Sequence, residues 1–204
     1  MRTLINIYIL LFSLLLVMAC SKEDEELVIN EIPVEDRCIF TEGDVLLYSC
    51  SNGSTDTVIV IKVDFKTESG PYTAWGTDVV LHNYLTDTQS MTIESSNDNW
   101  KTILNDIYDG IDSFSNRFII QSIPSYAYEE HYPDCEILFD GMVLGASEYW
   151  DEKIFNDKSY KKVYHIKPRG DSYEIYWNLK YGIISFMGIS NGTKLIWQFE
   201  DKVL

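Results

Sequence analysis

Ten short runs of β-forming residues, separated by turn residues, constrain the fold more than any other feature of this 204-residue sequence. They lie at 44–50, 57–66, 79–85, 90–94, 117–123, 136–145, 160–167, 173–177, 181–189 and 193–199. Runs of this length bounded by Gly, Pro, Asn, Asp and Ser are typical of antiparallel strands. Aromatic residues, which suit pleated sheet surfaces, make up 14% of the chain. We predict a mainly β fold with a single antiparallel curled sheet, half-barrel or barrel-like in form.

One segment departs from this pattern and has helical periodicity. Its apolar residues are Trp100, Ile103, Leu104, Ile107, Ile111 and Phe114. Intervals of three and four residues place such side chains on one face of a helix. We therefore predict one amphipathic helix near 97–115, whose apolar face covers the sheet.

Two turn sequences set the register of two hairpins. Asn191-Gly192 is a favoured two-residue hairpin turn, and it pairs Ser190 with Thr193 and Phe186 with Trp197. This register predicts a buried face with Ile184, Phe186, Leu195, Trp197 and Phe199, and a mainly wet face with Ser185, Lys194 and Gln198. Asp140-Gly141 similarly pairs Phe139 with Met142.

The amino-terminal segment has the features of an export signal. An apolar run from Leu4 to Ala19 follows Arg2, and it is short for a bilayer span of about 20 residues. Val17, Met18 and Ala19 before Cys20 resemble the lipobox of bacterial lipoproteins. That resemblance implies that Cys20 carries a diacylglycerol group and becomes the first residue of the mature chain. The alternative is a cleaved secretory signal followed by an acidic linker.

The residues after Cys20 resemble the acidic tether with which some Gram-negative bacteria export lipoproteins to the cell surface. They are Lys22, Glu23, Asp24, Glu25 and Glu26. The resemblance implies an outer-membrane protein, lipid-anchored through Cys20 and exposed at the cell surface. We predict a signal peptide at 1–19, a lipidated acidic tether at 20–37 and a single mainly β domain at 38–204.

The carboxyl-terminal runs resemble the closing strands of a group of uncharacterised outer-membrane lipoproteins of Gram-negative bacteria. The matching positions are Tyr160, Val163, Tyr164, Tyr181, Gly182, Ile183, Ile184, Phe186 and Trp197. They cover about forty residues and are ordinary β-core types, so the resemblance implies a fold and a non-enzymatic domain. It carries over no catalytic residue.

Charge and motif content exclude several functions. The net charge of −16 argues against nucleic acid and anionic lipid head groups as partners, because both need a basic patch. The common catalytic and nucleotide-binding motifs are missing from the sequence, so we expect no catalytic residue, no metal site and no cofactor. The strand pattern predicts that His165 occupies a solvated or half-buried strand position.

Three cysteines remain after Cys20: Cys38, Cys50 and Cys135. An oxidising compartment would allow one disulfide among them, and the sequence leaves all three pairings open.

Aromatic residues in turn-rich stretches are the candidate ligand-binding residues. They are Tyr72, Trp75, Tyr126, Tyr128 and Trp150. Exposed rings could stack on sugars, whereas the alternative is that they fold back on the core. The sequence thus predicts a non-catalytic binding or interaction module with a glycan or protein ligand. The alternatives are a lipid-carrier-like periplasmic lipoprotein, with an apolar ligand held between sheet and helix, and a hydrolase without a recognisable motif.

Overall fold

The computed structural model describes residues 27–73, 80–96, 100, 116–122, 135–139, 141–167, 172–190 and 192–203, except the side chains at 72, 81, 82 and 190. The chain forms two compact units. The smaller unit takes in 1–29 and 69–85, and the larger unit takes in 30–68 and 86–204.

Most of the described residues belong to β-strands. They are β1 (Leu27–Asn30), β2 (Val45–Cys50), β3 (Thr55–Thr73), β4 (Val80–Ser95), β5 (Arg117–Ser122), β6 (Cys135–Phe139), β7 (Met142–Leu144), β8 (Glu148–Phe155), β9 (Lys158–Ile166), β10 (Tyr173–Asn178), β11 (Gly182–Ser190) and β12 (Thr193–Val203). One 3-10 turn, η1 (Val34–Asp36), precedes β2. No helix among these residues has the length and hydropathy to cross a membrane.

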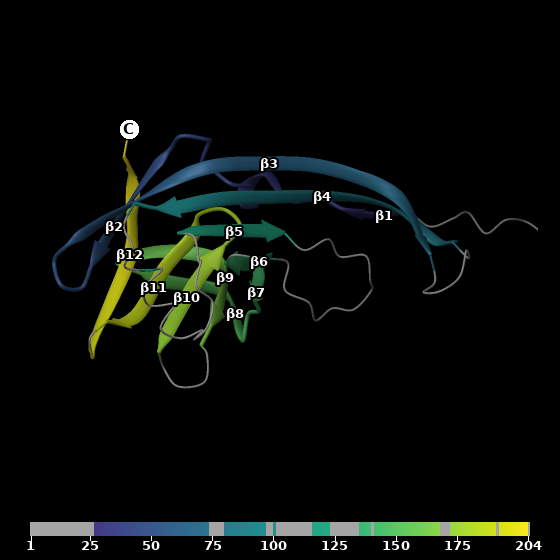
Figure 1. The fold of residues 1–204 in the computed structure, drawn as a ribbon. Helices are drawn as coiled ribbons and strands as arrows, with labels where there is room; N and C mark the ends of the chain where they lie inside the picture. The colour runs from purple at the N-terminus through teal and green to yellow at the C-terminus, as the bar shows by residue number, and fades with distance from the viewer. Residues whose placement is uncertain are drawn as a thin grey trace, which may run out of the picture. The chain divides into compact units, whose positions relative to one another are not determined.

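One sheet contains all of these strands, in the order β7-β6-β5-β4-β3-β2-β12-β11-β10-β9-β8, and β1 pairs with β4. The larger unit confirms the predicted mainly β fold, because its part of the sheet is antiparallel and curls into a half-barrel with edges at β7 and β8 (Figure 1). The smaller unit holds most of β1 and the adjoining ends of β3 and β4. In that unit, a Cβ atom at Gly70 would lie 3.2 Å from the Tyr84 hydroxyl, so the ring passes close over the glycine backbone.

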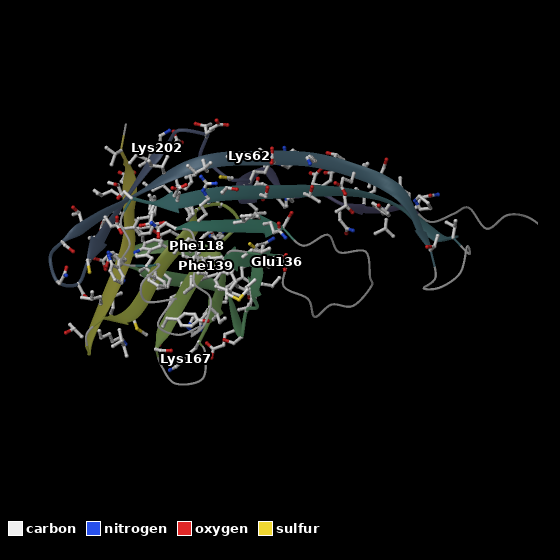
Figure 2. All side chains as sticks on the ribbon, viewed as in Figure 1. Lys62, Phe118, Glu136, Phe139, Lys167 and Lys202 are labelled. Atoms are coloured by element: carbon white, nitrogen blue, oxygen red, sulfur yellow. The ribbon has the colours of Figure 1, made fainter. Side chains whose placement is uncertain are left out.

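Aromatic side chains fill the core of the larger unit. Trp100 is 1% exposed, and its ring lies 5.0 Å from Tyr48 and 5.1 Å from Phe186. Phe118 and Phe139 point toward one another from β5 and β6, with ring centres 4.9 Å apart (Figure 2). Because rings of this size interdigitate around Trp100, the inner face of the curled sheet is packed solid at these positions.

The predicted hairpin registers are confirmed. Ser190 pairs with Thr193, Phe186 with Trp197, and Phe139 with Met142. The predicted wet face of the last hairpin is wrong at Ser185, which is 3% exposed. Ser185 lies opposite Tyr176 of β10, whose ring belongs to an aromatic cluster on that side of the sheet.

Other differences from the predicted elements follow from interrupted patterns. The runs at 79–85 and 90–94 belong to one strand, β4, and neither β1 nor β8 was predicted. The helix predicted near 97–115 lies outside the described residues apart from Trp100, and it is not confirmed.

Cys38, Cys50 and Cys135 are free thiols, so the structure does not contain the disulfide that an oxidising compartment would allow. Cys50 ends β2 and Cys135 begins β6, with β3, β4 and β5 between them in the sheet. Neighbouring strands are about 4.8 Å apart, which puts this pair well beyond the roughly 7 Å limit between Cα atoms in a disulfide. Cys38 instead lies 3.5 Å from the Met91 sulfur.

Candidate functional site

The segment before β2 is held against the sheet by buried polar side chains. Asp87, which is 8% exposed, accepts hydrogen bonds from the Thr67 hydroxyl at 2.7 Å and from Arg37 at 3.3 Å. Gln89 accepts from the Cys38 amide at 2.9 Å and donates to the Leu179 carbonyl at 3.1 Å. These bonds fix the backbone that leads to Ile39 and Phe40, next to the turn between β10 and β11.

The β8–β9 hairpin reaches β12 through its turn. Asn156 and Asp157 form the turn with φ angles of 46° and 62°. The Asn156 amide donates to a Glu200 carboxylate oxygen at 3.2 Å, and the Lys158 ammonium donates to the Glu200 carbonyl. Lys162 in β9 also has a positive φ of 51°, and its ammonium lies 3.0 Å from Asp36. The hairpin is thus fastened at its tip and at its middle.

A pocket of about 300 Å³ lies where these two segments meet β12. Its lining residues are Ile39, Phe40, Lys158, Ser159, Tyr160, Tyr181, Phe199, Glu200, Asp201 and Lys202. The aromatic members touch one another, with ring centres 5.2 Å apart for Tyr160 and Tyr181 and 5.8 Å apart for Phe40 and Phe199. The pocket therefore combines aromatic walls with two positive and two negative side chains.

Two phenolic groups line this pocket without a hydrogen-bond partner among the described residues: Tyr160 and Tyr181. Burial, reinforced by the neighbouring Tyr181 and Glu200, raises the pKa of Tyr160 to about 12. Tyr160 is therefore neutral at physiological pH. A neutral phenol is both a donor and an acceptor, so it can pair with a ligand hydroxyl.

A second cluster of rings lies on β8, β9 and β10. His165 stacks on Tyr176 with ring centres 4.2 Å apart, and Trp150 lies 5.3 Å from His165 and 5.9 Å from Tyr176. Strand register explains the meeting, because His165 is opposite Tyr176 on β10 and opposite Glu148 on β8. Phe155 connects the cluster to the pocket, with its ring 5.0 Å from Tyr176 and 6.0 Å from Tyr160.

Carboxylates flank His165 on both sides of its ring. The Nδ1 atom lies 3.2 Å from a Glu148 oxygen, while Nε2 lies 3.8 Å from a Glu174 oxygen and makes no hydrogen bond. Burial lowers the pKa of His165, although the hydrogen bond to Glu148 opposes this. We take the ring as neutral at pH 7, because it is 3% exposed and one nitrogen has no partner. His165 is thus buried, whereas the sequence predicted a solvated or half-buried position.

The cluster also holds a cation. The Lys153 ammonium lies 3.5 Å from the centre of the Trp150 ring, 4.5 Å from that of Tyr176 and 5.8 Å from that of Phe155. We call these three aromatic residues the β8–β10 cage.

Of the candidate ligand-binding residues, Trp150 is described in full, and it belongs to the β8–β10 cage. Trp75, Tyr126, Tyr128 and the side chain of Tyr72 lie outside what the structure describes. Cys20 and the tether residues 22–26 also lie outside it.

The sequence prediction missed the pocket, because its lining comes from segments far apart in the chain. Tyr160 and Tyr181 were identified only as β-core positions, and nothing in the local pattern marks Phe40 or the end of β12. No group of three or more His, Cys, Asp or Glu residues suited to a metal ion occurs in the described part of the chain. Comparisons with family models, curated proteins and solved structures found no match.

Proposed function

We propose that this protein is a lipoprotein, anchored through Cys20 and exposed at the outer-membrane surface, that acts as a non-catalytic binding module. The observation that carries the binding proposal is the pocket with aromatic walls and charged rim. Its volume is at the lower end of the range for small-molecule sites, about 300–1,000 Å³. It therefore suits a ligand about the size of one sugar ring.

The chemistry of the lining favours a glycan end as that ligand. The C–H faces of a sugar ring can pack on the rings of Tyr181 and Phe199, while its hydroxyl groups need donors and acceptors. The free phenols supply both, and the Asp201 carboxylate supplies an acceptor. Opposite charges balance along the rim, so the pocket does not select strongly for an ion.

Our proposal favours binding at this pocket over the alternative lipid-carrier function. A carrier needs a hollow apolar space between the sheet and its cover. At that place Trp100 is buried against Tyr48, Phe186 and Phe118, and the pocket described above lies elsewhere. The binding proposal does not depend on a hollow core.

The test is titration of the purified protein with the methyl glycosides of glucose, galactose, mannose and N-acetylglucosamine, followed by saturation-transfer NMR. We expect binding of at least one sugar. Tyr181→Phe, which keeps the ring, should weaken it about 2- to 13-fold, because one hydrogen bond contributes roughly 0.5–1.5 kcal/mol. Tyr149→Phe is the matched control, since Tyr149 lies on β8, is 46% exposed and does not line the pocket. Equal loss in both variants, or no binding of any of these sugars, would contradict the proposal.

A further inference from the structure

The environment of Lys153 has the chemistry of a cation-binding site. Three aromatic rings surround its ammonium group, and Trp150 is the nearest at 3.5 Å. Ring faces carry negative electrostatic potential, and several of them around one point attract a cation. Two carboxylates lie close enough to add to this field, since Glu148 and Glu174 both act to raise the pKa of Lys153.

The cage contacts the Lys153 ammonium through ring faces and not through hydrogen bonds. The Lys153 ammonium makes no hydrogen bond and no ion pair with any described residue, although it has three N–H donors. Burial accordingly lowers the pKa of Lys153, against the effect of the two carboxylates. The site therefore holds the ammonium group through rings and a negative field, without a hydrogen bond from Lys153 to a described residue.

Among the described residues, Lys153 is the only cation that lies over the rings of the cage. His165, which stacks on Tyr176, is neutral at pH 7. The Lys167 ammonium lies 3.8 Å from the Oε1 atom of Glu174, whereas the Tyr176 hydroxyl donates to the Oε2 atom of the same carboxylate. Glu148 is 57% exposed, so an incoming cation meets a carboxylate at the entrance.

We propose that the β8–β10 cage of Trp150, Phe155 and Tyr176 binds quaternary ammonium groups, and that Lys153 is a built-in occupant which such a ligand displaces. A quaternary ammonium has no N–H donor, so it loses nothing where no hydrogen bond is made, whereas a lysine ammonium is better solvated in water. The long lysine side chain can swing out to solvent when the ligand enters. This site is separate from the pocket, and the inference does not depend on the pocket's ligand.

The test compares four forms of the protein by calorimetric titration with tetramethylammonium chloride, with ammonium chloride as the competing simple cation. Wild type should bind tetramethylammonium weakly, because Lys153 competes for the cage. Lys153→Ala should bind at least 10-fold more tightly. Lys161→Ala is the matched control: it removes the same charge from an exposed position on the neighbouring strand β9, and it should leave affinity within 2-fold of wild type. Trp150→Phe keeps an aromatic ring and should weaken binding several-fold in the Lys153→Ala background.

Two results would overturn the proposal. One is that Lys153→Ala binds no more tightly than Lys161→Ala, which would show a general effect of charge. The other is that ammonium chloride competes as well as tetramethylammonium does. The Lys153→Ala variant then tests where the quaternary ammonium ligand comes from. Its binding is measured to free choline, to phosphatidylcholine vesicles and, as the comparison, to phosphatidylglycerol vesicles. Binding of choline alone assigns the site to free solutes, and added binding to phosphatidylcholine vesicles assigns it to lipid head groups.

Discussion

Replacing Gly182 with alanine tests whether the start of β11, next to the pocket residue Tyr181, requires a residue without a Cβ. Gly182 begins β11 directly after Tyr181 and has a φ of +70°, in the left-handed region. A residue with a Cβ there costs about 1–2 kcal/mol. The new Cβ would also overlap the terminal methyl carbon of Met91, which is 1% exposed, and overpacking of a core costs about 1–3 kcal/mol. We expect Gly182→Ala to lower the free energy of unfolding by about 2–5 kcal/mol.

A double-mutant cycle measured by urea unfolding separates the two causes. In a Met91→Ala background the overlap disappears, so Gly182→Ala should there cost only the backbone contribution of about 1–2 kcal/mol. Gly53→Ala is the matched control, because Gly53 has a φ of +86° with no atom within 4 Å of an added Cβ. It should also cost about 1–2 kcal/mol. The reasoning is refuted if Gly182→Ala costs no more than Gly53→Ala, or if it costs the same with and without Met91.

Three further outcomes are expected. Asp157→Gly should raise the free energy of unfolding in urea by roughly 1 kcal/mol, because removing a Cβ at a φ of 62° relieves about 1–2 kcal/mol while the greater freedom of glycine in the unfolded chain costs about 0.4–1 kcal/mol. The change also creates an Asn-Gly turn, and an unchanged midpoint would count against that turn geometry. The lowered pKa of His165 means that, below its unfolded value of 6.5, the unfolded chain takes up a proton before the folded chain does. The stability that the neutral ring contributes is therefore complete above pH 6.5 and is lost as pH falls through the lower folded pKa. His165→Gln should show a smaller loss of urea stability between pH 7.5 and 5.5, and equal losses would contradict a depressed pKa. Protease added to intact cells should cleave wild type but not a variant with residues 22–24 replaced by alanine, and Cys20→Ser should lose its membrane anchor; equal protection of wild type and the tether variant would place the protein in the periplasm.

Local sequence signals were enough to predict most strands but not their full extent. The Asn191-Gly192 turn predicts the last hairpin, because its two residues fix both the turn type and the pairing of Phe186 with Trp197. The sequence pattern did not predict β8, because Asp151 and Glu152 interrupt the apolar residues Tyr149, Trp150 and Ile154. That strand is at the edge of the sheet, where charged side chains face water at little cost.

The two sites depend on contacts between distant segments, which sequence patterns do not reveal. Trp150 was a candidate because it is an aromatic residue in a turn-rich stretch, and the structure places it in the cage. Nothing in the sequence links Trp150 to Tyr176 on a strand two positions away in the sheet. No sequence feature predicts the positive φ of Lys162 either, because the residues usually found in that conformation are Gly, Asn and Asp.

The β8–β9 hairpin connects both sites to the chain that leads toward Cys20. Phe155 of the cage and Tyr160 of the pocket occupy opposite arms of this hairpin, with their ring centres 6.0 Å apart. The ion pair between Lys162 and Asp36 joins the hairpin to η1, within the predicted tether. This pair is partly exposed and contributes at most about 1 kcal/mol, whereas the neighbouring Arg37 is held by the buried Asp87. A pull on the chain from the Cys20 side would act first on the pairing of β1 with β4, and then on the contacts of Asp87 with Ile32 and Arg37.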